Sequence, residues 1–290
     1  RAFKFGGEEY WTCRGLAHAL AHDWSGGLRV LGSGELENWA ARSLSDEEHA
    51  NTVRTALAGS QAVQSGQGED RALARALIAL DPLAPIRLKS VAARVEALGQ
   101  AIALDYEDTE KRNQLADAIL SKLPHRWLEL KGAQLAMQPQ LIQQFERMAF
   151  FLGRNQIGYG AERVLYEYNP DWPCLSPLVR GRYVSSVDRL LPALEAVAAQ
   201  GPPEGEPVDR HFAAFCAARM KPSPDRIVQG LGKSGDDAER HRAMLHLLAD
   251  LQHRTGLETA PALCKWVVKF VDPVVEALHN RKVKEKARKK

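Results

Sequence analysis

The sequence predicts an all-α protein, a multi-helix array or short solenoid of about a dozen helices with a small N-terminal β-hairpin. Hydrophobic residues make up 45% of the 290-residue chain, too many for a disordered protein. Only 7% of the residues are aromatic, so the apolar content is mostly Ala, Leu and Val. Ala and Leu are strong helix formers. Apolar residues also recur three or four positions apart along most of the chain, which is the spacing of one helix face.

The first eleven residues depart from this helical pattern. Phe3 and Phe5 precede a Gly-Gly pair at positions 6 and 7, and Tyr10 and Trp11 follow it. A Gly pair between two short β-favouring runs is typical of a tight hairpin turn. We therefore expect a small hairpin whose aromatic side chains pack on the first helix.

Helices of ordinary length are expected to follow the hairpin. A first helix over 16–24 should end at the Gly pair of positions 26 and 27, and a second should begin at Ser33. Ser45 and Glu48 form a capping box, which predicts a long helix that continues beyond residue 53.

The helical pattern continues through the rest of the chain. A stripe over 73–80 should stop at Asp81, because a proline disfavours helical geometry in the residue before it. The Pro-rich stretch 169–186 should be an ordered loop, and 200–207 a flexible surface loop. Trp266 and Phe270 should lie in a core. Further helices are expected around residues 90–98, 115–119, 141–152, 187–197, 244–251 and 263–278.

The chain length favours two helical halves over one core. We place the first half, with its hairpin cap, at 1–135, the second at 136–280, and a basic tail at 281–290. Each half contains a helix with an Arg-x-Leu step that ends in Asp-Pro-x-x-Pro or Asn-Pro-x-x-Pro, at Pro82 and at Pro170. This similarity indicates an internal duplication. The alternative is a coincidence between two common helix stops.

Motifs that would indicate catalysis or cofactor binding are incomplete. His18 and His22 have the i, i+4 spacing of a metal pair, but no Glu completes a zinc-protease motif, and surface histidines are the simpler interpretation. The Gly-Leu-Gly-Lys-Ser run that begins at 230 resembles a phosphate-binding loop, but Ile227 stands where that motif needs Gly. Cys216 should be a buried small residue, whereas Cys174, in the Pro-rich loop, could be exposed. We expect no enzyme activity, cofactor or metal.

The positive charge is concentrated at the C-terminus. The last ten residues hold seven Lys or Arg and one Glu, whereas the remaining 280 hold 32 Lys or Arg against 35 Asp or Glu. A nucleic-acid-binding domain usually spreads its basic residues over one face, so a solubilising linker is the simpler interpretation. Binding to an anionic partner is the alternative. The basic residues of this tail are Arg281, Lys282, Lys284, Lys286, Arg288, Lys289 and Lys290.

The Pro-rich segment 169–185 is the candidate surface for a protein partner. We expect it beside a groove between the two halves, where its aromatic and basic side chains would recognise a peptide. The alternative is that they fix the loop to the core, which we favour for the tryptophan. The candidate residues are Tyr166, Trp172, Arg180, Arg182 and Tyr183.

The first 45 residues carry a resemblance. The matching residues are Phe5, Gly7 and Tyr10, then Leu16, Ala17, Ala19, Leu20, Ala21 and Trp24, then Leu31, Ser33, Gly34, Leu36 and Trp39. This pattern resembles helical accessory regions of bacterial regulatory proteins of the protein-kinase or Hsp70-like-chaperone kind. The resemblance implies a non-enzymatic partner of another domain or protein, and it assigns no site residue.

These observations together predict a non-catalytic interaction or regulatory scaffold module of a larger bacterial protein. The chain begins with Arg rather than Met, which favours a fragment or a processed chain, and its widely spaced cysteines favour a reducing cytoplasm. No apolar run reaches the roughly 18–20 residues that span a bilayer. The alternatives are a nucleic-acid-binding protein that uses the basic tail, and an enzyme of an unfamiliar helical type.

Overall fold

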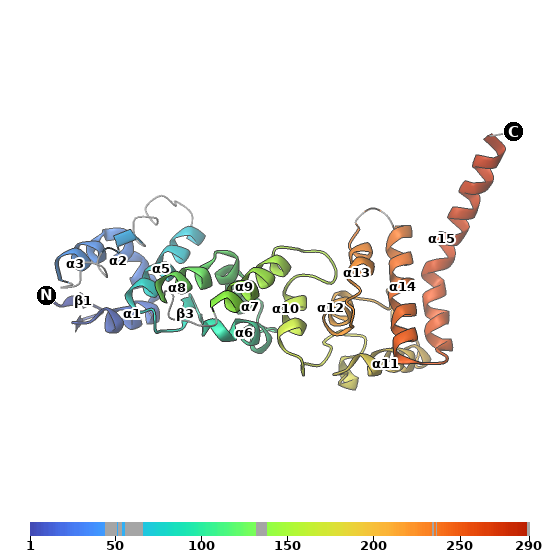
Figure 1. Ribbon diagram of the computed structural model, residues 1–290, viewed down its shortest axis with the longest axis horizontal. Helices are drawn as coiled ribbons and strands as arrows, with labels where there is room; N and C mark the ends of the chain where they lie inside the picture. The colour runs from blue at the N-terminus through green and yellow to red at the C-terminus, as the bar shows by residue number, and fades with distance from the viewer. Residues whose placement is uncertain are drawn as a thin grey trace. The chain divides into compact units, whose positions relative to one another are not determined.

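The computed structural model describes residues 1–43, 51, 54–55, 66–131, 138–233, 235 and 237–288 (Figure 1). The chain divides into two compact units, unit 1 over Arg1–Phe150 and unit 2 over Phe151–Lys290. The sequence had placed this division after residue 135, but it falls within the helix α9, Gln138–Leu152. The capping box expected at Ser45 and Glu48 lies outside the described residues.

Unit 1 combines helices with two short hairpins. The first hairpin confirms the expectation from the Gly pair, with Phe3 paired to Tyr10. The second hairpin pairs Ile86 with Ala93. Its elements are β1 (Phe3–Phe5), β2 (Glu8–Tyr10), α1 (Cys13–His22), α2 (Trp24–Ser33), α3 (Glu35–Ser43), α5 (Gly66–Leu80), β3 (Ile86–Leu88), β4 (Val91–Ala93), the 3-10 turn η1 (Val95–Ala97), α6 (Leu98–Leu104), α7 (Thr109–Leu120), α8 (Leu123–Lys131) and most of α9.

Helix α5 lies at the centre of the unit 1 core. It contacts α1, α2, α8 and β3, and the expected stripe of Leu73, Ala76, Leu77 and Leu80 is buried. The first hairpin joins this core through Phe3, whose ring meets that of Trp39 edge-on at 5.6 Å. The sequence had expected all the hairpin aromatics to pack inward. The structure corrects this for Trp11, which is 73% exposed.

The first helices end at different places from those expected. The helix over 16–24 stops at His22, because Asp23 begins a new helix by accepting a hydrogen bond from the amide of Gly26 (2.8 Å). The Gly pair at 26 and 27 therefore lies inside α2 rather than after α1. Ser33 is the last residue of α2, and Gly34 then adopts the left-handed conformation that ends a helix.

A strand pair replaces the helix expected over 90–98. Residues 91–93 form β4, and regular helix begins only at Leu98. The duplication hypothesis is also wrong. The helix before Pro82 is followed by this hairpin and packs on α1 and α8, whereas the helix before Pro170 is followed by an irregular loop and packs on α12. Asp-Pro and Asn-Pro stop helices in unrelated settings, because proline restricts whichever residue precedes it.

Unit 2 is built around α12, in which every residue from Phe212 to Ala218 is buried. Helix α10 packs on α12, while α14 contacts α11, α13 and α15. Trp266 is buried as expected, but Phe270 is only half-buried. The elements are α10 (Ala161–Tyr168), the 3-10 turn η3 (Arg180–Arg182), α11 (Val187–Ala199), α12 (Arg210–Arg219), α13 (Asp225–Leu231), α14 (Asp237–Thr255) and α15 (Pro261–Arg288).

Two irregular segments of unit 2 agree with the sequence. Residues 169–186 contain no regular helix apart from η3, and 200–207 contain none. The second segment is nevertheless held in place, since Trp266 Nε1 donates to the carbonyl of Gly205 (2.9 Å) and Glu206 pairs with Arg240 (2.8 Å).

Two glycines of α2 provide a matched test of the unit 1 packing. A Cβ at Gly27 would lie 2.9 Å from a Leu73 methyl carbon and 3.0 Å from the Leu20 carbonyl oxygen, whereas a Cβ at Gly32 would meet nothing within 4 Å. We expect Gly27→Ala to lower the free energy of unfolding by about 1–3 kcal/mol through overpacking. We expect Gly32→Ala to raise it by about 0.5–1 kcal/mol. Denaturant titration checks both, and equal effects of the two substitutions would contradict the packing of α2 on α5.

Candidate functional site

Tyr166 anchors the Pro-rich loop from beneath. It lies in the last turn of α10 with only 1% of its surface exposed, and its ring meets Phe215 of α12 edge-on at 5.2 Å. Its hydroxyl accepts a hydrogen bond from the amide of Leu175 (2.9 Å) and lies 2.8 Å from Nδ1 of His211. One buried phenol therefore ties the loop to two helices, α10 and α12.

A second group of bonds closes the loop and fixes it to the start of α12. The amide of Cys174 donates to the carbonyl of Val184 (2.7 Å), which brings the two sides of the loop together. The hydroxyl of buried Ser176 donates to one carboxylate oxygen of Asp209 (2.6 Å). The other oxygen of Asp209 caps α12 by accepting from the amide of Phe212 (2.8 Å). The loop and the helix terminus are thus held by one shared carboxylate.

Arg219 holds the beginning of the loop. Its guanidinium donates to the carbonyl of Asn169 (2.6 Å) and lies 3.4 Å from the carbonyl of Trp172. Burial lowers the pKa of this guanidinium, although nearby Asp171 opposes the shift. Trp172 itself is half-buried, which fits the interpretation that it fixes the loop rather than contacting a partner.

The tip of the loop projects three side chains into solvent. The turn η3 carries Arg180 and Arg182, both exposed, and ends at Tyr183, which is 68% exposed. Tyr183 adopts φ 49° and ψ 62°, in the left-handed region. This conformation costs a residue with a side chain roughly 1–2 kcal/mol. Within the described part of the chain, neither the Tyr183 ring nor the Arg182 guanidinium has a hydrogen bond, ion pair or ring contact to offset that cost.

The structure therefore separates the five candidate residues into two groups. Tyr166 and Trp172 form the base of the loop, and Tyr166 is too deeply buried to touch a partner. The remaining three (Arg180, Arg182 and Tyr183) form a surface that we call the loop tip. All five belong to unit 2, so the site is described within that unit alone.

Cys174 is buried at the base of the loop, contrary to the expectation that it could be exposed. Burial raises the pKa of its thiol to about 12, an effect that hydrogen bonds from the Ser176 backbone and with Tyr166 only partly oppose. Cys216 is fully buried as expected, and burial raises its pKa strongly. Since the thiolate is the nucleophilic form, burial makes both thiols poor nucleophiles at neutral pH.

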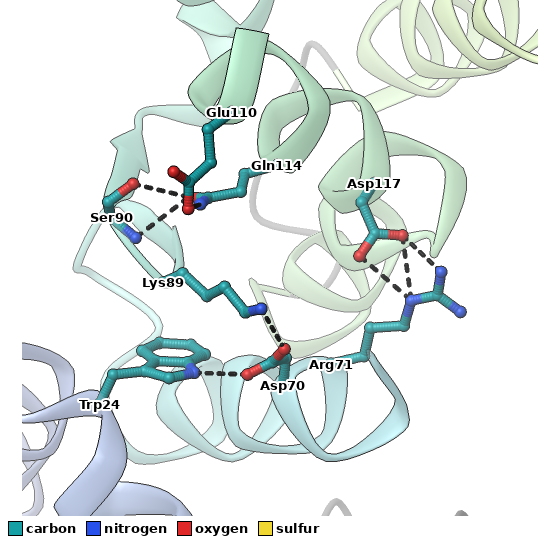
Figure 2. A network of polar contacts seen from close by, with 8 residues as sticks. All are labelled: Trp24, Asp70, Arg71, Lys89, Ser90, Glu110, Gln114 and Asp117. Carbon is teal, nitrogen blue, oxygen red and sulfur yellow. Dashed lines mark hydrogen bonds and ion pairs between the residues drawn. The ribbon is translucent and has the colours of Figure 1, made fainter. Parts of the chain in front are cut away.

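A second polar network, in unit 1, was not expected from the sequence (Figure 2). Asp70 of α5 is 6% exposed, and its two carboxylate oxygens accept from Trp24 Nε1 (2.7 Å) and from Lys89 Nζ (2.8 Å). Lys89 lies in the β3–β4 turn with a positive φ of 54°, and the hydrogen bond to Asp70 raises the pKa of its ammonium group. The Lys89–Asp70 ion pair offsets the cost of the left-handed conformation of Lys89, whereas Tyr183 has no such ion pair.

The same hairpin turn is bound to α7. The Gln114 side-chain oxygen accepts from both the amide (3.1 Å) and the hydroxyl (2.8 Å) of Ser90, and the Gln114 amide group donates to Glu110 (3.1 Å) (Figure 2). Arg71 of α5 also meets Asp117 of α7, with Nε–Oδ1 at 3.0 Å, and this bond raises the arginine pKa. The β3–β4 hairpin is therefore fixed to both helices at its turn.

His18 and His22, which have the spacing of a metal pair, lie on the surface of unit 1. The rings of His18 and His22 lie 4.1 Å apart on exposed turns of α1, and Nδ1 of His22 bonds to the carbonyl of His18. Over the described ranges no three His, Cys, Asp or Glu side chains gather in a way that could hold a metal ion. The tail continues α15 as helix to Arg288, while Lys289 and Lys290 lie outside the described residues.

Comparisons with known protein families, with curated proteins and with solved structures found no match. None of the helices in the described part of the chain has an apolar stretch that could cross a bilayer.

Thiol labelling tests whether the loop is held as described. All four cysteines are free, Cys264 is exposed, and Cys174 and Cys216 are buried with raised pKa values. With a maleimide at pH 8, we expect Cys264 to react first and Cys174 to react only as the loop opens, because a buried protonated thiol is a poor nucleophile. Mass spectrometry of digested samples assigns the sites. Labelling of Cys174 at the rate of Cys264 would contradict the closed loop.

Proposed function

We propose that the chain is a non-catalytic helical interaction module that binds an acidic segment of a partner protein, or of an adjacent domain, through the loop tip. The observation that carries this proposal is Tyr183, an exposed aromatic residue held in a left-handed conformation. In the described residues the exposed ring has no hydrogen bond and no ring contact that would offset the cost of this conformation. A contact with a partner would supply the missing compensation.

The composition of the tip supports a protein partner. Tyrosine and arginine are the residues that most often dominate binding energy at protein interfaces. A guanidinium pairs with a carboxylate through two parallel hydrogen bonds, so Arg180 and Arg182 favour an acidic segment. The fixed base of the loop supports the proposal as well, because a loop that is ordered before binding loses less entropy when the partner binds.

The wider setting belongs to the same proposal. The attachment to a larger bacterial regulatory protein, of the kinase or Hsp70-like-chaperone kind, rests on the pattern of the first 45 residues. The cytoplasmic location rests on four cysteines that are all free thiols. Nucleic-acid binding by the tail stays an alternative prediction. That binding would weaken steeply with salt and would be lost on deletion of 281–290.

Affinity purification with a loop-tip variant tests the proposal. The triple variant Arg180→Ala, Arg182→Ala and Tyr183→Ala removes the tip without touching the loop base. We expect at least one protein retained by the wild-type chain to be lost, with its affinity reduced at least about tenfold, since hot-spot truncations typically cost more than about 1–2 kcal/mol each. Quantitative mass spectrometry of the retained proteins, followed by titration of the purified partner, measures the effect.

A matched control carries Arg29→Ala, Arg42→Ala and Leu104→Ala, which remove two exposed arginines and an exposed apolar residue from unit 1. This variant should retain the same partners as the wild type. The proposal is wrong if the loop-tip variant and the wild-type chain retain the same proteins with the same affinity.

A further inference from the structure

A pocket in unit 1 is lined by residues of that unit alone, whereas the loop tip belongs to unit 2. Its volume is about 530 Å³, within the range of natural ligand sites. Helix α1 forms one wall, with Arg14 and His18. The end of α5, the segment after it and the first residues of β3 form the other wall, with Asp81 and Arg87. The apolar part of the lining includes Leu77 and Pro85.

The charges of this pocket leave one arginine without a counter-ion. Asp81 has both carboxylate oxygens engaged, one by the Nε of Arg14 (3.4 Å) and the other by the amide of Leu83 (3.1 Å). Arg87 is half-buried, and in the described residues its guanidinium has no hydrogen bond and no ion pair. The pocket lining thus contains two arginines and one carboxylate. A partly desolvated guanidinium binds a carboxylate more strongly than an exposed one does.

Two exposed apolar side chains lie next to the pocket in sequence. Trp11 immediately precedes Thr12 and is 73% exposed, and Leu83 immediately precedes Ala84 and is 65% exposed. Both Thr12 and Ala84 line the pocket. Both residues are thus close in sequence to the pocket lining, and we expect their exposed apolar surface to be available to a ligand that is longer than the pocket.

The position of Arg87 is fixed before any ligand arrives. Arg87 is the middle residue of β3 and pairs with Ala92 of β4. The hairpin turn that follows is held by Lys89 to Asp70 and by Ser90 to Gln114 (Figure 2). These bonds fix the backbone that carries Arg87, so this segment loses little conformational entropy when a ligand binds.

We propose that this pocket binds a carboxylate-bearing, apolar peptide segment of another protein. Arg87 holds the carboxylate, with Arg14 as a second donor, and the apolar lining at Leu77 and Pro85 contacts an adjacent aliphatic side chain. Trp11 and Leu83 contact the residues of the peptide that extend out of the pocket. The carboxylate comes either from an acidic side chain or from the end of the peptide chain.

Titrations of the full chain with synthetic peptides, followed by amide NMR shifts to millimolar concentration, test this site. The probe is acetyl-Ala-Ser-Leu-Glu-Leu-Val with a free carboxyl end. Two further probes carry a C-terminal amide, or Gln in place of Glu, and inorganic phosphate is the fourth. We expect the first peptide to shift amides at 12–18 and 83–87. If the C-terminal amide abolishes binding, the pocket holds the carboxylate at the end of the peptide. If Gln in place of Glu abolishes binding, the pocket holds the side-chain carboxylate.

Matched variants connect the shifts to the pocket. Arg87→Gln should weaken peptide binding at least about tenfold, because a charge-assisted hydrogen bond is lost. Arg87→Lys, which keeps the charge but not the fork of donors, should fall between that variant and the wild type. Leu83→Ala should weaken binding about threefold through lost apolar area. Arg94→Gln, beyond the same hairpin, and Leu104→Ala, equally exposed elsewhere, should leave binding unchanged.

Three results would overturn the proposal. The first is that no peptide shifts these amides in a saturable way. The second is that Arg87→Gln, with its other amide signals at wild-type positions, binds as tightly as the wild type. The third is that inorganic phosphate binds as tightly as the peptide, which would mean that the apolar surface contributes nothing. Because the site lies in unit 1, none of these results bears on the loop tip of unit 2.

Discussion

The hydroxyl of Tyr166 is the interaction on which the candidate surface of unit 2 depends. A buried hydroxyl and a buried backbone amide must each find a partner, because an unsatisfied polar group in a protein interior costs about 1–3 kcal/mol. Tyr166 satisfies the amide of Leu175 and engages His211 at the same time. This constraint acts together with the Ser176–Asp209 and Arg219–Asn169 bonds to fix the loop on α12. Because the base of the loop is fixed, the surrounding chain can hold Tyr183 in the left-handed conformation despite its energetic cost.

In unit 1 the buried polar group is a carboxylate, and an ion pair helps to satisfy it. Asp70 is too buried to be hydrated, and its carboxylate is satisfied by the indole of Trp24 and the ammonium group of Lys89. These bonds fix the turn of a hairpin of only two three-residue strands, which would be marginal in isolation. Rigid short elements on a helical core are therefore a shared feature of both units. Arg87 and Arg182 each lie on such an element, and in the described residues their guanidinium groups have no hydrogen bond or ion pair.

The sequence predicted what depends on local pattern. Helical spacing located α5, α11 and α15, and the Gly pair located the first hairpin. The sequence misplaced helix ends that are set by a single capping side chain. Asp23, for example, starts a new helix in the middle of an apolar stripe. The sequence also missed the second hairpin, although Ile86, Leu88, Val91 and Ala93 alternate with polar or exposed positions around a two-residue turn. The networks around Asp70 and Tyr166 join residues 9 to 46 positions apart, and no local pattern indicates such contacts.

Hydrogen exchange of the Tyr166→Phe variant tests the anchoring of the loop most directly. The substitution keeps the ring in its contact with Phe215 and removes only the hydroxyl, leaving the amide of Leu175 and Nδ1 of His211 without their bonds. Exchange measured by mass spectrometry should accelerate at least about tenfold in peptides covering 174–184, the equivalent of a loss of roughly 1.4 kcal/mol. Peptides from α10 and α12 should keep their protection. Unchanged exchange across 174–184 would show that the loop is held by other means and would contradict the account.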